Sequence, residues 1–206
     1  MNLPAALDTV LTDPRIWRGR GSGHAQDTVA SGHAPLDATL PGGGWPRHAL
    51  SEILIPADGH GELQLVLPAL AALVGERGRV ALIDPPYVPF PPAWQTHGVD
   101  PAALALVDCA HEDGLWAAEQ CLRSGACAAV LLWPRRITHA QLRRLQVAAE
   151  SGRAMGFVFR DARCAAEASP AAVRVRLHPG MHGLEILKCR GGNPPAKRFA
   201  MPGHVH

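Results

Sequence analysis

Residues 49–74, which read ALSEILIPADGHGELQLVLPALAALV, decide the fold. The apolar residues 49–55 predict a strand, and the loop that follows them carries Gly59 and Gly61. In residues 63–74 the apolar side chains repeat at helical spacing, so a helix is predicted directly after the loop. A strand, a glycine-bearing loop and a helix in this order are the layout of a phosphate-binding loop.

The residues that give a phosphate-binding loop its chemistry are missing. Such a loop needs a glycine where the strand ends and Gly-Lys-Ser/Thr at the helix start, which supply bare N–H groups, an ammonium and a hydroxyl. Here Ile55 stands near the first glycine position, and Gly61 is followed by Glu62 and Leu63. A carboxylate at this place repels a triphosphate. The stretch also fits an ordinary strand-to-helix turn in which Glu62 stabilises the helix N-terminus.

The length and composition indicate one globular domain with tails. The chain has 206 residues, of which 47% are apolar, and a formal net charge of +2, which is too small to require nucleic acid as a partner. No uncharged apolar run approaches ~18 residues, and no secretory signal is recognisable. We therefore expect a cytoplasmic protein that does not contact a membrane. The five cysteines lack a C-x-x-C pair, so reduced thiols are expected.

Alternating strand and helix patterns predict an α/β fold with a mostly parallel central sheet flanked by helices. The alternation of valine and arginine over residues 172–177, followed by an apolar stretch at 184–188, predicts a C-terminal antiparallel hairpin. Thr138 and Gln141 form the pattern of a capping box. The proline run 85–92 is expected to be stiff and extended. Further strands are expected at 80–84, 104–107, 128–133 and 155–159, and further helices at 114–124 and from 138 to 150.

We divide the chain into three parts on this basis. Residues 1–34 form an N-terminal arm that is rich in glycine and arginine and cannot bury a core by itself. Residues 35–190 form the core domain, and residues 191–206 form a polar C-terminal tail.

Several segments together resemble known families. Residues 31–37, 40–46 and 50–54 resemble the opening of the RecA-type recombinase core. Five others resemble the ImuA family, bacterial accessory proteins of translesion DNA synthesis that are grouped with SulA-like proteins. These are IWRG (16–19), LWAAEQ (115–120), LRSGA (122–126), LLWP (131–134) and LRRLQ (142–146). The resemblance implies a degenerate RecA-like core.

The resemblance also implies where three chemical devices of RecA-type ATPases would fall. The phosphate-binding lysine and threonine fall near Glu62 and Leu63, the acidic residue that activates water near Pro86, and the magnesium-linked aspartate near Trp133. None of these residues can do the corresponding work. We therefore expect no ATP hydrolysis, weak or absent ATP binding, and no bound cofactor or metal. The relic loop positions are Ile55, Asp58, Gly59, Gly61, Glu62 and Leu63.

The function implied by the resemblance is that of a non-enzymatic adaptor of the SOS mutasome, which supports damage-induced, error-prone translesion synthesis. The implied partners are ImuB, the error-prone C-family DNA polymerase and RecA. The alternative is a SulA-type inhibitor of cell division that binds FtsZ, and a third hypothesis is a cryptic nucleotide-binding enzyme. The arm around Trp17 and the long proline run favour the ImuA interpretation. Self-association is left open.

Basic residues and one tryptophan are candidates for contacts with partners or single-stranded DNA. They also fit solvated faces of helices and strands, or a basic tail. The link between the strands near 159 and 173 is too short for a long DNA-binding loop, so any contact with DNA is expected to be weak. The candidates are Trp17, Arg18, Arg135, Arg136, Arg143, Arg144, Arg174, Arg176, Lys188, Arg190, Lys197 and Arg198.

Overall fold

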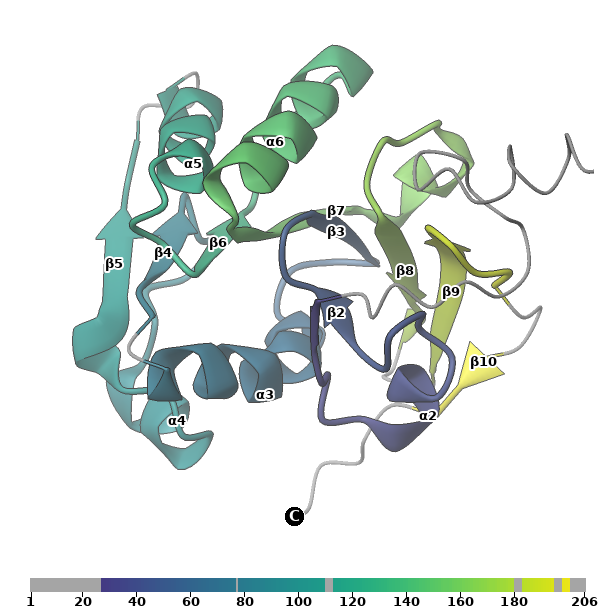
Figure 1. Cartoon of the computed structure of the whole chain (residues 1–206), viewed down its shortest axis with the longest axis horizontal. Helices are drawn as coiled ribbons and strands as arrows, with labels where there is room; N and C mark the ends of the chain where they lie inside the picture. The colour runs from purple at the N-terminus through teal and green to yellow at the C-terminus, as the bar shows by residue number, and fades with distance from the viewer. Residues whose placement is uncertain (1–26, 77, 110–112, 180–182, 195–197, 201–206) are drawn as a thin grey trace, which may run out of the picture.

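A computed structural model describes residues 27–76, 78–109, 113–179, 183–194 and 198–200 (Figure 1). The predicted contact residues Trp17, Arg18 and Lys197 lie outside these ranges. The helices are α2 (Ala34–Asp37), α3 (Glu62–Gly75), α4 (Pro91–Thr96), α5 (Asp113–Arg123) and α6 (His139–Gly152), with 3-10 turns η1 (Pro101–Ala103) and η2 (Ala162–Ala166). The strands are β1 (Thr28–Val29), β2 (Trp45–Pro46), β3 (Leu50–Ile55), β4 (Val80–Ile83), β5 (Leu104–Val107), β6 (Ala129–Leu132), β7 (Met155–Asp161), β8 (Val173–Leu177), β9 (Leu184–Cys189) and β10 (Arg198–Phe199).

The central sheet of the described residues has the strand order β10-β9-β8-β3-β7-β6-β4-β5. The strands from β8 to β5 in this order run parallel to their neighbours, whereas β9 and β10 are antiparallel. Every residue of β3, β4 and β6 is buried, as expected for parallel strands that are covered on both faces. The predicted mostly parallel sheet with a C-terminal antiparallel hairpin is confirmed.

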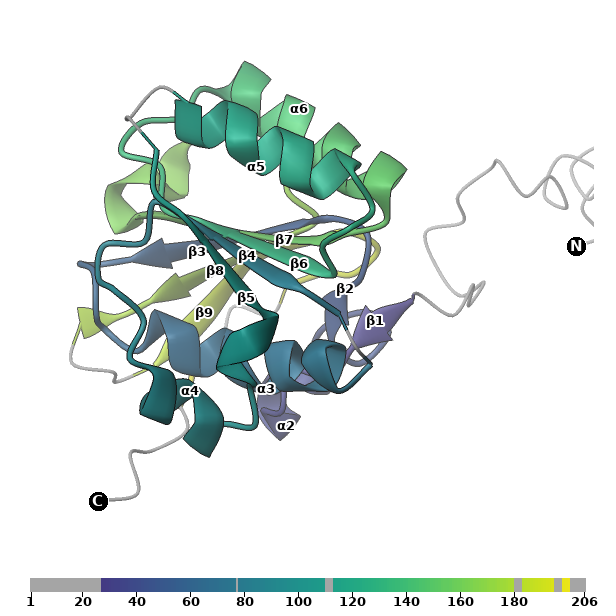
Figure 2. The same cartoon turned by 90° about the vertical axis from the view of Figure 1, so that its left-hand side faces the viewer.

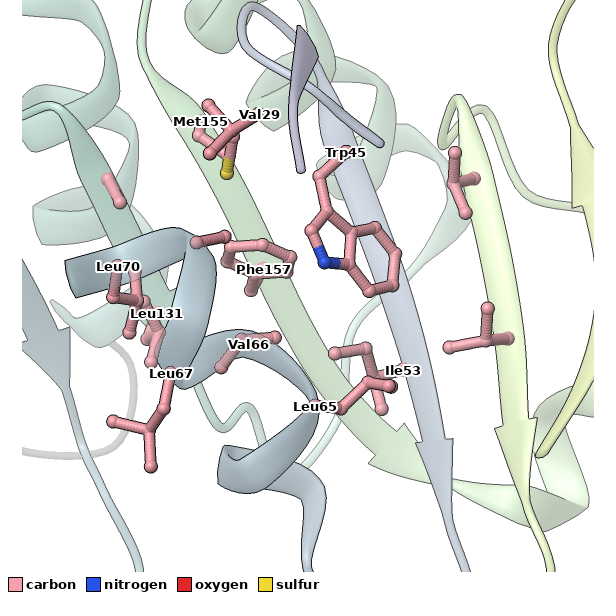
Figure 3. Close-up of a cluster of buried hydrophobic side chains, with 14 of the residues drawn as sticks. Val29, Trp45, Ile53, Leu65, Val66, Leu67, Leu70, Leu131, Met155 and Phe157 are labelled. Carbon is pink, nitrogen blue, oxygen red and sulfur yellow. The ribbon is translucent and has the colours of Figure 1, made fainter. Parts of the chain in front are cut away.

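Helices cover both faces of this sheet. Helices α5 and α6 lie on one face, and α3 and α4 lie on the other (Figure 2). The predicted capping box at the start of α6 is confirmed, because Thr138 accepts a hydrogen bond from the Gln141 amide and the Gln141 side chain bonds back to Thr138. On the α3 face, the Trp45 ring meets Phe157 edge-to-face with 5.4 Å between ring centroids (Figure 3).

The segment just before the predicted core is attached to the body of the protein. Strand β1 pairs antiparallel with β2, and both Val29 and Trp45 are buried. Gly44 permits this close approach, since a Cβ at that position would lie 2.1 Å from the Val29 carbonyl oxygen. In the predicted tail, β10 likewise pairs with β9.

The proline run differs from the prediction at its C-terminal end. Pro91 and Pro92 are the first residues of α4 instead of an extended segment. Proline is well tolerated at the first helical positions. An amide N–H would have no intrahelical acceptor there, so the absence of one from proline costs nothing, and the fixed φ of proline suits the helix. Of the helices in the described ranges, none combines the length and the apolar character needed to cross a bilayer.

Candidate functional site at the carboxyl ends of the strands

An open cavity of about 1180 Å³ lies at the carboxyl ends of the parallel strands β3, β4, β5, β6 and β7. Open α/β sheets bind ligands at this edge. Four predicted relic positions line the cavity, namely Ile55, Asp58, Pro86 and Trp133. The structure therefore brings together positions from three separate strand ends, and these side chains do not fill the space between them.

The loop between β3 and α3 has a backbone that depends on glycine. Gly59 and Gly61 have φ of 78° and 85°, in the left-handed region that favours glycine. Glu62, the first residue of α3, folds back so that its Oε1 accepts a hydrogen bond from the Gly59 amide at 2.9 Å. The carboxylate is thus held at the helix N-terminus, where its negative charge is stabilised. This geometry is the strand-to-helix turn that the sequence offered as one of two interpretations.

Only one of the two carboxylate oxygens of Glu62 has a hydrogen-bond partner among the described residues. The residue is buried, and its second carboxylate oxygen, Oε2, has no hydrogen-bond partner among the described residues. Neither Glu62 nor Leu63 lines the cavity. The position that the resemblance assigns to a phosphate-binding lysine therefore holds a carboxylate that bonds to its own loop.

At the end of β4, Asp84 is used to fix the backbone. It adopts φ of 48°, and its Oδ1 accepts a hydrogen bond from the Cys109 amide at 2.7 Å. A Cβ on Gly114 would lie 2.1 Å from Asp84 Oδ2, so this carboxylate packs against the first turn of α5, where a negative charge is favourable. Pro86, two residues later, carries no ionisable group.

Trp133 follows β6, at the position that the resemblance assigns to the magnesium-linked aspartate. Trp133 stacks on Phe159 of β7 with ring centroids 4.5 Å apart and an interplanar angle of 14°. The indole Nε1 is buried without a hydrogen-bond partner among the described residues. Arg135 and Arg136 follow at the cavity, and both are exposed without an ion pair to another described residue. This wall of the cavity offers aromatic surface and positive charge, with no metal ligand at the Trp133 position.

A buried ionic network joins β3, β7 and β8, and one of its members, Arg160, also lines the cavity. Glu52 is fully buried and accepts hydrogen bonds from Arg160 and Arg174. Arg160 also pairs with Glu167 at 2.7 Å, and Arg174 donates to the carbonyls of Glu167 and Cys164 at 2.9 and 3.0 Å. The network therefore ties the link between β7 and β8 to the central strand.

Arg160 of this network is held in its charged form. Burial alone would lower the pKa of Arg160, but the hydrogen bonds that it donates to Glu52 and Glu167 outweigh burial, so the pKa is raised. Arg160 also lowers the pKa of Glu167 through their hydrogen bond. The structure corrects one prediction, because Arg174 is buried in this network and not exposed for contact with DNA. An acidic residue inside an apolar strand, as Glu52 is, was a signal in the sequence that a buried partner exists.

The two candidate arginines of α6 are on its surface. Arg144 pairs with Glu119 of α5 at 2.5 Å, whereas Arg143 is exposed without an ion pair to a described residue. Glu119 was not singled out from the sequence, although it lies at regular helical spacing with Arg123, its second partner.

The candidates on the C-terminal hairpin are mostly engaged within the protein. Arg198 lies exposed on β10. Burial lowers the pKa of Lys188. The described partners are Glu185 for Arg176 (2.5 Å), the Ser169 carbonyl for Lys188 (2.7 Å) and Glu150 for Arg190 (3.0 Å). These basic residues thus form separate local contacts and do not form one continuous patch of unpaired charge.

Comparison with known proteins gives partial matches to RecA. No protein-family profile matches the chain. RecA from Staphylococcus aureus strain JH9 is 33% identical over 136 residues, which cover 62% of this chain and 39% of RecA, and RecA from strain Newman gives the same values. The chain therefore spans about two fifths of the length of the curated relatives it matches. This likeness supports a distant relationship to RecA.

Among solved structures, SulA from Pseudomonas aeruginosa matches with a TM-score of 0.45 at 23% identity. The match covers 53% of this chain and 96% of that one.

Proposed function

We propose that this chain is a non-enzymatic, RecA-like adaptor that supports damage-induced, error-prone translesion DNA synthesis by binding protein partners. One observation carries the proposal: the cavity at the carboxyl ends of the strands is open, but Pro86 and Trp133 line it, and Glu62 stands at the adjoining loop. An ATPase of the RecA type needs a cation, an acid and a metal ligand at these three places.

The chemistry of each place supports the absence of turnover. The Glu62 carboxylate is negative and bonds to the Gly59 amide, so it cannot neutralise a phosphate. Pro86 cannot activate water, and the Trp133 indole has no lone pair with which to hold Mg²⁺. Asp84 is the nearest acid in sequence to Pro86, and it is engaged with the Cys109 amide and the first turn of α5.

The partners follow from the resemblance to ImuA and from the similarity to RecA. They are ImuB, the error-prone C-family polymerase and RecA itself. A chain that keeps a RecA-like sheet without ATP chemistry is suited to present surfaces to such proteins. Exposed Arg135, Arg136 and Arg143 also support a weak contact with single-stranded DNA, which would decrease as salt increases.

Binding of the purified full-length chain to its partners tests the proposal. The immobilised chain is incubated separately with purified RecA and ImuB, and the chain in solution is sedimented with polymerised FtsZ. We expect retention of RecA or ImuB and no co-sedimentation with polymerised FtsZ. Retention of neither RecA nor ImuB would overturn the proposal, and binding to FtsZ alone would establish the SulA-type alternative.

A further inference from the structure

A second surface with the features of a binding site lies on the outer side of helices α5 and α6. The two helices lie side by side over the same face of the sheet (Figures 1 and 2). Their inner sides are buried, as Leu122 of α5 and Leu145 of α6 show. We define the α5–α6 face by four exposed side chains on the outer side: Trp116, Arg123, Arg144 and Val147.

The face exposes two large apolar side chains. Trp116 is 62% exposed and Val147 is 49% exposed. Trp116 lies three residues before Glu119 on α5, and Val147 lies three residues after Arg144 on α6, so each is one turn from the same ion pair. Tryptophan and arginine are the residue types that most often carry binding energy at protein interfaces.

Hydrogen bonds to Glu119 hold two arginines in position on this face. The buried carboxylate of Glu119 accepts hydrogen bonds from Arg123 at 2.9 Å and from Arg144 at 2.5 Å. Because two guanidinium groups share one carboxylate, the cluster keeps a net positive charge. Both side chains are already held in place, which reduces the entropy that binding would cost.

Another arginine lies close to this cluster in the sequence. Arg143 of α6 is exposed without an ion pair to a described residue, and Glu150, the acidic residue of α6, is paired with Arg190. The cluster and Arg143 together hold three arginines and one carboxylate, so this part of the surface attracts an acidic partner.

We propose that the α5–α6 face binds an acidic segment of a partner protein. Aromatic or aliphatic side chains of that segment pack on Trp116 and on Val147, which lie on opposite sides of the ion pair, and its carboxylates pair with Arg123 and Arg144. The inference rests on the proposed adaptor function and specifies the chemistry of the partner.

Two other occupants fit less well. A second copy of the chain, docked face to face, would bring two positive surfaces together. Single-stranded DNA would find one aromatic ring among the four side chains of the face, whereas proteins that bind single strands without sequence preference stack successive bases on several rings.

Fluorescence anisotropy with the full-length chain tests the proposal. The probe is a short labelled peptide of Asp, Glu, Leu and Phe, and the reference peptide has serine in place of each acidic residue. We expect Trp116→Ala to weaken binding of the acidic probe at least about tenfold and Arg144→Gln to weaken it about threefold. The serine peptide should bind more weakly than the acidic probe.

Two matched variants control for the loss of any exposed ring or charge. Phe90 is 68% exposed and lies outside the face, and Arg79 is exposed just before β4. Phe90→Ala and Arg79→Gln should leave the affinity within about twofold of the unaltered chain. Because all the substituted side chains are exposed, circular dichroism should show the same fold in every variant.

The outcomes separate this inference from the proposed function. If Trp116→Ala binds the acidic probe as tightly as the unaltered chain does, or the serine peptide binds equally well, the inference is wrong. It is also wrong if Trp116→Ala loses labelled oligo(dT) and keeps the acidic peptide. Peptide binding that depends on Trp116 in a chain that retains neither RecA nor ImuB would contradict the adaptor function instead.

Discussion

Glu52 in β3 and Glu62 at the start of α3 are both buried glutamates, but their surroundings differ. Glu52 receives hydrogen bonds from two buried arginines. Glu62 receives one hydrogen bond from the Gly59 amide and leaves Oε2 without a described partner. The first site is a completed polar network that holds three strands together. The second is a strand-to-helix turn that satisfies its carboxylate only in part.

This difference shows which part of a RecA-like core is constrained by folding. A buried charge must be paired for the chain to fold, so the network around Glu52 supports the sheet directly. The β3–α3 loop is shaped by its two glycines and by the apolar side of α3, and these do not require a lysine at the helix start. The fold therefore does not depend on a lysine at this place.

We expect the largest loss of stability when Glu52 is replaced. Glu52→Ala leaves Arg160 with only its half-exposed partner Glu167 and leaves Arg174 without a carboxylate. Removing one partner of a buried ion pair costs about 3–5 kcal/mol, and we expect a loss of that size in urea unfolding. Arg163→Ala, which breaks an exposed ion pair with Asp161, is the control and should lower the free energy of unfolding far less than Glu52→Ala does. A loss for Glu52→Ala no larger than that for Arg163→Ala would show that the network does not support the fold.

Glu62→Ala should destabilise the protein less than Glu52→Ala does. The substitution removes one hydrogen bond to the Gly59 amide and also removes an unpaired buried oxygen. A single hydrogen bond contributes about 1 kcal/mol, so the free energy of unfolding should fall by about that amount or less. Urea unfolding measured beside Glu52→Ala tests the ranking. A loss for Glu62→Ala as large as that for Glu52→Ala would mean that the loop carboxylate is as important to folding as the network.

Much of the fold could be predicted because its parallel strands and amphipathic helices have distinct apolar patterns. The strand at 50–55, the helix from 62 and the capping box at Thr138 each depend on neighbours in the sequence. The position of Arg174 could not be predicted in this way. Its alternation with valine is typical of an exposed strand face, but its carboxylate partner, Glu52, lies 122 residues away.

The resemblance to the RecA-type core pointed to part of the cavity lining and not to the shape of the cavity. Pro86 and Trp133 line the cavity, whereas Glu62 does not. The sequence could not tell whether side chains fill the space between the strand ends, since that depends on rotamers such as the stacking of Trp133 on Phe159. The role of Glu119 was hidden for the same reason, because the ion pair with Arg144 joins two helices.

We expect the smallest effect on stability at acid pH, when the Arg163–Asp161 pair is removed. The hydrogen bonds from Arg163 lower the pKa of Asp161 to about 2. A carboxyl group whose pKa is lower in the folded state stabilises that state at neutral pH, and this contribution is lost as the pH falls from about 4 to about 2. Glu167 and Glu185, whose pKa values are lowered by hydrogen bonds from Arg160 and Arg176, act in the same direction.

The urea midpoint should therefore be constant between pH 7 and pH 5 and decline below about pH 4. Arg163→Ala should reduce the steepness of that decline slightly, because Asp161 then titrates nearer its ordinary pKa. Identical slopes in the two proteins would show that this exposed pair does not contribute to acid stability.

ATP turnover by the purified full-length chain, with Mg²⁺ and with or without single-stranded DNA, shows directly whether this protein works without ATPase activity. We expect release of phosphate at the rate of a blank without protein. The double variant Glu62→Lys with Leu63→Thr should give the same rate, because Pro86 and Trp133 still supply neither base nor metal ligand. Turnover by the unaltered chain that rises with protein concentration and disappears when a substitution is made at the cavity, such as Asp84→Asn, would make this protein an ATPase and overturn the proposed adaptor function.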